Sequence, residues 1–256
     1  MLFFNEGMFM VMPAKSKTGS HNIRRRNAII VSLLIAGVVV SLCAYLLVMN
    51  SGGVVPVKSE IELVEAIDGV KIGGSAVIVL DKDIDLTAVI VIPARKNITL
   101  TSNDENEFKL AGADRASTLY VETGGVLILN GIIVTHANGA DGNGVENYGT
   151  LIMHSGKISD NTTNYSSGGG VNTSGVFEMY DGEIVNNVAK VAGGGVSINN
   201  GVFSIFGGVI SGNAVSGLGG FGSGGVYRYE WGGTFNWHGG EIYGNKADNN
   251  EDIYDP

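Results

Sequence analysis

Apolar and polar residues alternate with a period of two in four short segments between residues 142 and 247. In each segment two large apolar side chains stand two positions apart: Leu151 and Met153, Phe177 and Met179, Phe203 and Ile205, and Phe235 and Trp237. Alternation places such residues on one face of a β-strand, whereas a helix would need a spacing of three or four. The pattern therefore predicts short strands, each with one apolar face turned toward a core.

Each of these strands belongs to a longer repeated unit. A glycine corner follows the alternating residues, and after it comes a single apolar residue between polar neighbours: Ile158, Ile184, Ile210 or Ile242. A weaker copy precedes these units, with Gly131, Ile133 and His136 in the places of Gly156, Ile158 and Asn161. Short strands joined by glycine corners predict the coils of a parallel β-solenoid, which stack at a distance of about 4.8 Å.

An asparagine ends each unit: Asn161, Asn187, Asn213 and Asn245. Successive members lie 26, 26 and 32 residues apart, so they stand above one another when the coils stack. Asparagine tolerates the left-handed backbone conformation of a corner, and its side-chain amide can donate to the amide oxygen of the adjacent coil. We expect these four residues to form a structural ladder rather than a row of binding residues.

The unit GGGVNTSGVFEMYDGEIVNNVA resembles the repeats of right-handed parallel β-helix proteins of the pectate-lyase-like superfamily. The resemblance is to their adhesin-like surface repeat proteins and to polymorphic outer membrane adhesins, and it covers residues 142–247. It implies an all-β fold, a right-handed parallel β-helix, and a surface function without catalysis.

The residues upstream of the repeats predict how the solenoid begins. Glu60–Ile67 has the amphipathic pattern of a short helix. Four runs with strand character follow it: Ala76–Leu80, Val89–Pro93, Asn97–Leu100 and Gly125–Leu129. This order is similar to the beginning of such β-helices, where a capping helix prevents edge-to-edge pairing of the first coil. We expect about seven coils in a β-helix domain that spans residues 59–256.

Residues 28–49 form an uncharged apolar run of 22 residues. A helix of that length spans about 33 Å, which matches a hydrocarbon core of about 30 Å. Three arginines precede the run and no basic residue follows it before Lys58, so the positive-inside rule places the N-terminus in the cytoplasm. We therefore expect a transmembrane signal anchor at 28–49 after a cytoplasmic tail at 1–27.

A linker at residues 50–58 would then join this anchor to an extracellular body. A cleaved signal peptide is the alternative to a retained anchor. The sequence before Cys43 also resembles a lipoprotein signal, although Leu42 stands where that pattern has a small residue. Because Cys43 is the only cysteine, no disulfide within the chain stabilises the body.

Composition and charge narrow the classes of function. Forty of the 256 residues are glycine, and 31 of these lie between residues 124 and 245. Corners with positive φ need glycine, and we expect the runs Gly168–Gly170 and Gly193–Gly195 to serve as such corners. The net charge is −9, and residues 1–27 contribute +4 to it, which leaves −13 for the body. A body this acidic lacks the basic face that nucleic-acid binding requires.

The repeat region offers little catalytic chemistry. Lyases of the superfamily need clustered carboxylates for calcium and a basic residue, and its glycosidases need two carboxylates that face one sugar bond. Glu183 and Glu241 occupy equivalent positions two coils apart, about 10 Å, which is just beyond the range for an inverting pair. Asp81, Asp83 and Asp85 alternate but lack the glycine of a calcium loop, so we expect a solvated strand face. We predict no catalytic residue, no metal and no cofactor.

One row of rings occupies the same place in consecutive repeats: His154, Tyr180, Phe206 and His238. These residues point away from the apolar face, so they predict a stacked row on the surface of the solenoid. Exposed flat rings suit sugar faces and mark interaction sites, which makes this row the candidate ligand-binding site. Alternatively, the rings stack only to fix the register of the coils.

These features predict a membrane-anchored extracellular β-helix that binds polysaccharide or cell-surface glycans of a host or neighbouring cell. The competing hypothesis is a polysaccharide lyase or glycoside hydrolase, and a third is a purely structural surface rod. Few residues follow Asn245, so we expect either a gene fragment or an open end that associates with another molecule end to end.

Overall fold

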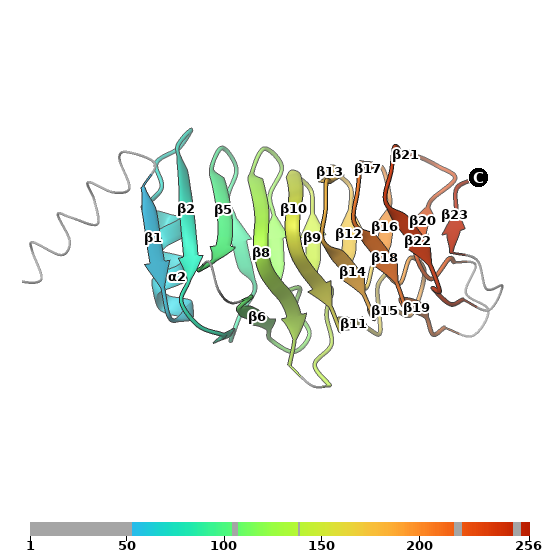
Figure 1. The fold of residues 1–256 in the computed structure, drawn as a ribbon, viewed down its shortest axis with the longest axis horizontal. Coiled ribbons are helices and arrows are strands. Elements are labelled where there is room, and N and C mark those ends of the chain that lie inside the picture. The colour runs from blue at the N-terminus through green and yellow to red at the C-terminus, as the bar shows by residue number, and fades with distance from the viewer. Residues whose placement is uncertain (1–52, 104–106, 138, 218–221, 248–251) are drawn as a thin grey trace, which may run out of the picture. The chain divides into compact units, whose positions relative to one another are not determined.

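The computed structural model describes residues 53–103, 107–137, 139–217, 222–247 and 252–256. Strands wind around one axis and stack coil upon coil along it (Figure 1). The result is a parallel β-solenoid of about seven turns with one short helix. The structure thus confirms the predicted all-β solenoid and its number of coils.

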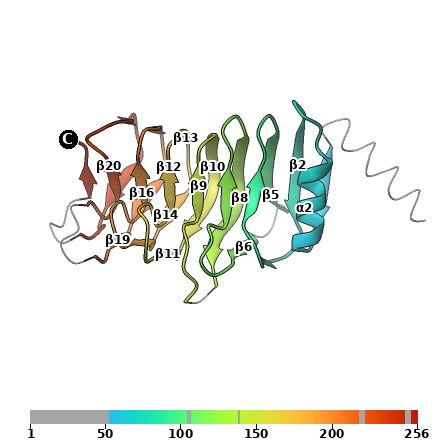
Figure 2. The same cartoon turned by 180° about the vertical axis from the view of Figure 1, so that it is seen from behind.

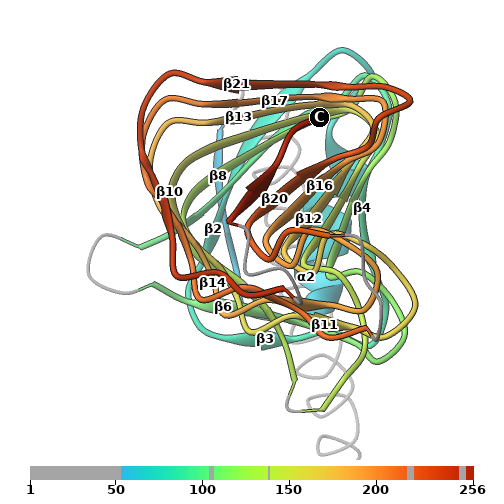
Figure 3. The same ribbon diagram turned by 90° about the vertical axis from the view of Figure 1, so that its right-hand side faces the viewer.

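Three sheets run along the stack and enclose the core, as the view along the axis shows (Figure 3). The first sheet contains, in spatial order, β1 (Val54–Val57), β2 (Ser75–Leu80), β5 (Asn97–Ser102), β8 (Val126–His136), β10 (Thr150–Ser159), β13 (Val176–Met179), β17 (Val202–Ile205) and β21 (Thr234–Trp237). Shorter strands pair beside them in the same sheet: β3 (Ile84–Asp85), β6 (Lys109–Gly112), β14 (Glu183–Val185), β18 (Val209–Ser211) and β22 (Glu241–Tyr243).

The other two sheets complete each coil. The second sheet contains β4 (Ile90–Ile92), β7 (Leu119–Val121), β9 (Val145–Asn147), β12 (Val171–Thr173), β16 (Val196–Ile198), β20 (Val226–Arg228) and β23 (Ile253–Tyr254). The third sheet contains β11 (Thr162–Thr163), β15 (Val188–Ala189) and β19 (Ala214–Val215). Neighbouring strands are parallel, so each residue lies beside its equivalent in the next coil.

The alternating apolar residues form the core, as their spacing predicts. Leu151 lies beside Phe177 in register, and Phe177 lies beside Phe203. All three side chains are completely buried. The rings of Phe177 and Phe203 stack with centroids 4.6 Å apart and planes 12° apart. Burial of each such side chain contributes about 1.5–3 kcal/mol, and ring stacking adds about 0.5–1.5 kcal/mol.

The last described coil departs from this prediction. Phe235 lies beside Phe203 in register but is only half-buried, and the side chain of Trp237 is 52% exposed. Ile242 is likewise half-buried, although its equivalent Ile210 is completely buried. The physical reason is that β21 and β22 each have a paired strand on one side only among the described residues.

The helix α2 (Glu60–Gly69) lies at the opposite end of the stack (Figure 2). Ser59 caps its N-terminus, because the side-chain oxygen accepts a hydrogen bond from the Glu62 N–H at 3.3 Å. At its C-terminus the Lys96 ammonium donates to the carbonyl oxygens of Ile67 and Asp68, at 2.9 and 3.0 Å. These contacts tie the predicted N-terminal helix to the first coils.

The start of the described chain adds a strand to the first sheet. The expected linker at 50–58 contributes strand β1, which pairs with β2, because Val55 and Val57 bury their side chains in the core. The predicted tail at 1–27 and anchor at 28–49 lie outside the described residues. Within the described ranges, none of the chain forms a helix of sufficient length and apolar character to span a membrane.

The glycine runs are only partly explained by positive φ. Gly156 does adopt φ +93° at its corner, and Gly168 adopts φ +70°. Gly170 and Gly195 have no such backbone, yet a Cβ atom on either would lie 2.7 or 2.8 Å from a carbonyl oxygen of the next coil. Close approach between coils, rather than corner conformation, therefore requires glycine at these two positions.

Candidate functional site

The row of rings occurs on the surface at the end of successive strands of the first sheet. Tyr180, Phe206 and His238 each donate a backbone N–H to a carbonyl of the preceding coil at 2.8 Å, which fixes their register. Ring centroids are 5.3 Å apart for His154 and Tyr180, 4.9 Å for Tyr180 and Phe206, and 4.8 Å for Phe206 and His238. The structure therefore brings all four predicted residues into one continuous row.

The orientation of these rings limits what they can contact. The planes of Tyr180 and Phe206 are 9° apart, and those of Phe206 and His238 are 10° apart, so the faces largely cover one another. Tyr180 and Phe206 remain 43% and 41% exposed. A ligand beside the row would therefore meet ring edges and the uncovered parts of the faces. Desolvation and the nearby Glu178 carboxylate raise the pKa of the Tyr180 hydroxyl.

The four asparagines lie in one buried column at the corner between the first and third sheets. The side-chain Nδ2 of Asn161 donates to Oδ1 of Asn187 at 2.8 Å, Asn187 to Asn213 at 2.9 Å, and Asn213 to Asn245 at 2.8 Å. Each backbone N–H donates to the same oxygen as well. Every Oδ1 of Asn187, Asn213 and Asn245 thus accepts two hydrogen bonds from the preceding coil.

The backbone at this corner corrects the expectation about left-handed residues. Positive φ occurs one residue before each asparagine of the column: Asp160, Asn186, Gly212 and Gly244. The column asparagines themselves are not among the residues with positive φ. Their role is to satisfy buried backbone groups, as Asn187 does when its Nδ2 donates to the Ile158 carbonyl oxygen at 2.8 Å.

Both ends of the column recruit other residues. His136 lies at the first end, with Nδ1 2.8 Å from Oδ1 of Asn161 and Nε2 2.8 Å from the Ala116 carbonyl oxygen. Its strand is shifted by one residue from the expected alignment, because Val134, not Ile133, lies beside Ile158 in register. The offset is the same on both sides of the irregular pairing at Ser155, because Met153 lies beside Leu129 and Gly156 lies beside Ile132.

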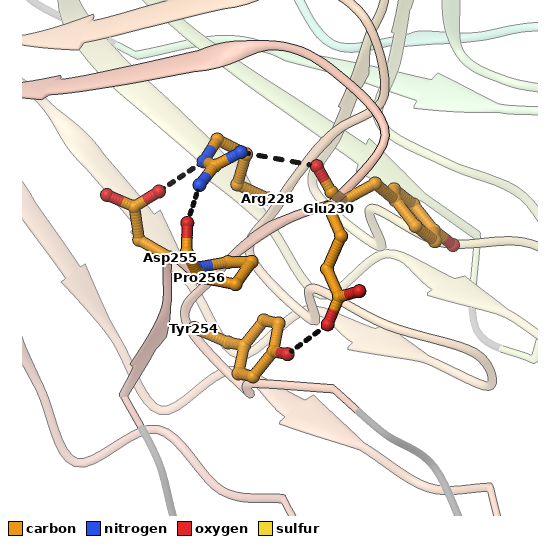
Figure 4. Close-up of polar contacts among 6 residues, drawn as sticks. Arg228, Glu230, Tyr254, Asp255 and Pro256 are labelled. Atoms are coloured by element: carbon orange, nitrogen blue, oxygen red, sulfur yellow. Dashed lines mark hydrogen bonds and ion pairs between the residues drawn. The ribbon is translucent and has the colours of Figure 1, made fainter.

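At the other end Asp252 accepts hydrogen bonds at Oδ1 from the backbone N and the Nδ2 of Asn245, at 2.7 and 3.0 Å. Asp255 forms an ion pair with Arg228, and the Tyr254 hydroxyl donates to Glu230 at 2.9 Å (Figure 4). Asp252 and Asp255 therefore fasten the last residues to the preceding coil.

Sequence reasoning missed a polar cluster on the outer face of the second sheet. Tyr120, Glu146 and Asn172 lie side by side in register on β7, β9 and β12. The Asn172 side-chain amide donates to both carboxylate oxygens of Glu146, at 3.0 and 3.2 Å. The Tyr148 ring stands 5.5 Å from that of Tyr120, with planes 38° apart. These residues differ in type from coil to coil, so no repeated residue marks the cluster in the sequence.

The electrostatics of this cluster centre on Glu146. Burial raises the pKa of its carboxyl group above the ordinary value, although hydrogen bonds from Asn172 and Tyr148 act in the opposite direction. The Glu146 charge in turn raises the pKa of the Tyr148 hydroxyl. A half-buried carboxylate with a raised pKa, held by neutral donors, marks a candidate site.

The carboxylates that the sequence offers for catalysis or for calcium binding contact other groups. Glu183 lies 3.5 Å from the Lys157 ammonium, and Val209 separates it in register from Glu241. Asp83 accepts a hydrogen bond from the Lys109 backbone N–H at 2.8 Å, and Asp81 lies 3.8 Å from Lys58. None of these acids faces a second carboxylate in a hydrogen-bonded pair among the described contacts.

A cavity of 720 Å³ lies beside the His136 corner. Its lining includes Lys109, the hydroxyl groups of Thr135, Ser159 and Thr162, and the side chain of Asn164. Thr135 and Ser159 alternate with the core residues Val134 and Ile158, so their side chains point away from the core. Both side chains are nevertheless buried. His136 and Asp160 line it as well, and the lining can hydrogen-bond a small polar molecule.

No family model matches the chain, and neither does a curated protein or a solved structure. The class of the protein therefore follows from its geometry: it is a parallel β-solenoid repeat protein with in-register rows of rings and amides on successive coils.

Proposed function

We propose that this protein is an adhesin-like surface protein, a membrane-anchored extracellular right-handed β-helix that binds polysaccharide without catalysis. The observation that carries the proposal is the row of His154, Tyr180, Phe206 and His238, whose rings stay exposed along four consecutive coils. Its repeat distance of 4.8–5.3 Å is close to the length of one sugar ring. A polymer chain laid along the row would meet an equivalent contact at every coil.

The predicted anchor at 28–49, with three arginines directly before it, supports a location of the body outside the cell. An acidic body would favour neutral glycans over uronate or phosphate polymers, because like charges repel. The alternative of a polysaccharide lyase or glycoside hydrolase needs an acid and a base that act on one sugar bond. Glu183 and Asp83 instead contact the Lys157 ammonium and the Lys109 N–H. A structural rod would use the same rings only to hold register.

Affinity electrophoresis of the full chain in gels that contain galactomannan, laminarin, xylan or polygalacturonate tests the proposal. We expect retardation by a neutral polymer, and we expect Tyr180→Ala combined with Phe206→Ala to weaken it at least tenfold. Tyr165→Ala is the matched control, because this tyrosine is 83% exposed and lies outside the row. Binding that survives the double substitution would exclude the row as the site, and depolymerisation in the presence of calcium would favour the enzyme.

A further inference from the structure

The outer face of the second sheet carries a second group of residues with the chemistry of a ligand site. Tyr120 and Glu146 are half-buried and Tyr148 is 41% exposed, so all three are reachable from solvent. In the following coils the same outward row becomes buried, because Asn172 is 8% exposed and Ser197 is completely buried. The group is therefore open on the side of Tyr120 and closed on the side of Ser197.

A chain of amides fixes the acceptor at its centre. Asn199 donates from Nδ2 to Oδ1 of Asn172 at 3.0 Å, and Asn172 donates from Nδ2 to both oxygens of Glu146. This orients the Asn172 amide, since its oxygen accepts and its nitrogen donates. The carboxylate is thereby held rigidly without a positively charged partner in any of its hydrogen bonds.

A second observation indicates that the polar groups here are incompletely satisfied. The hydroxyl of Ser197, which lies between Asn172 and Tyr227 in register, is buried and has no hydrogen-bond partner among the described residues. Buried polar groups normally have partners, and exceptions cluster where a ligand or water completes the network. Ser197 lies beside Asn172 in register, two coils from Glu146, at the closed side of the group.

We infer that Glu146, Asn172, Tyr120 and Tyr148 form a second binding site, which takes a neutral polyhydroxyl ligand such as an uncharged oligosaccharide. Vicinal hydroxyl groups both donate and accept, so they match a carboxylate acceptor beside a phenol and an amide. The planes of the two tyrosine rings are 38° apart, against 9° for Tyr180 and Phe206 in the row, so their faces cover each other less than the faces of that pair. Exposed aromatic surface of this kind suits the apolar face of a sugar.

Other ligand classes fit less well. An anionic ligand would be repelled by the Glu146 carboxylate. The side chains that hydrogen-bond this carboxylate, Asn172 and Tyr148, are neutral and do not compensate its charge. A bare cation would need several oxygen ligands, and among the described residues no group of three or more acidic, histidine or cysteine side chains could hold a metal ion. The site lies on a different sheet from the ring row and shares only the ligand class with the proposed function.

Isothermal titration of the full chain with galactomannan, laminarin and xylan oligosaccharides tests this site, with polygalacturonate oligosaccharides and calcium chloride as the alternative ligands. We expect at least one neutral oligosaccharide to bind, and we expect Tyr148→Ala and Glu146→Ala each to weaken binding at least tenfold. Tyr165→Ala and Glu65→Gln are the controls, because both residues are exposed and lie outside this site and the ring row. Unchanged melting temperatures of the variants would show that they fold.

The variants also separate this inference from the proposed function. The combined Tyr180→Ala and Phe206→Ala variant keeps the Glu146-dependent binding if two sites exist. Wild-type affinity for every neutral oligosaccharide in Tyr148→Ala would overturn the second site and leave the ring row untouched. Binding of calcium or polygalacturonate alone would overturn it as well, and so would the absence of any neutral ligand.

Discussion

The side-chain oxygen of Asn213 accepts two hydrogen bonds from Asn187 of the preceding coil, one from the backbone N–H and one from Nδ2, both at 2.9 Å. Asn187 repeats the arrangement with Asn161, whose backbone N and Nδ2 donate at 3.1 and 2.8 Å. The column therefore connects the four coils that carry these asparagines through buried side chains, which couples the stability of those neighbouring coils.

Replacement of Asn187 by leucine should destabilise the solenoid strongly. The substitution leaves the buried Ile158 carbonyl and the Asn161 N–H without partners, and each costs about 1–3 kcal/mol. We expect the free energy of unfolding to fall by about 3–5 kcal/mol and the melting temperature by about 10 °C. Chemical denaturation and thermal melting measure both. Asn164→Leu, at an exposed asparagine, is the control, and equal effects of the two variants would contradict a structural column.

Alanine should destabilise the protein more at a glycine that allows two coils to approach closely than at a glycine whose only special feature is a positive φ. A Cβ atom at Gly175 would lie 2.1 Å from the Gly149 carbonyl oxygen, although the backbone of Gly175 is not left-handed. Gly124 has φ +82° but nothing within 4 Å of such a Cβ. We expect Gly124→Ala to cost about 1–2 kcal/mol, from the backbone strain alone. Gly175→Ala should cost more, because two coils must separate.

The comparison of these two alanine variants by urea denaturation decides between the explanations. If Gly124→Ala were the more damaging substitution, corner conformation rather than interstrand distance would limit the glycine positions. Equal effects would likewise contradict the stacking explanation.

The charge state of Glu146 should make stability depend on pH. Burial raises the folded-state pKa of this carboxyl group above its ordinary value of 4.5, so the folded protein binds the proton more tightly than the unfolded chain. The resulting stabilisation is complete below pH 4.5 and is lost as the pH rises through the folded-state value. Glu146→Gln removes this titration.

We therefore expect the stability of the wild type, measured relative to Glu146→Gln by denaturation from pH 4 to pH 8, to decline with increasing pH. Glu178→Gln, on the first sheet, supplies the matched comparison. Parallel pH profiles of the wild type and Glu146→Gln would show that the carboxyl group titrates alike in both states.

Much of the fold could be predicted from the sequence because it repeats. The alternation at Leu151 and Met153, and the isoleucine at 158 after a glycine corner, recur often enough to determine strand, face and register together. The ring row could be predicted for the same reason, since parallel in-register stacking places equivalent residues beside each other. The site around Glu146 could not, because Tyr120, Glu146, Asn172 and Ser197 differ in type from coil to coil.

By itself, then, the sequence determined the period, the core-facing residues and the rows that identical residues form along the stack. The tertiary structure alone decided that His136 and Asp252 end the asparagine column and that β1 extends the first sheet. It also decided that Glu146 is half-buried among neutral donors. A repeated residue reveals its neighbour through its own spacing, whereas contacts between unlike residues depend on distances and burial that only the folded chain defines.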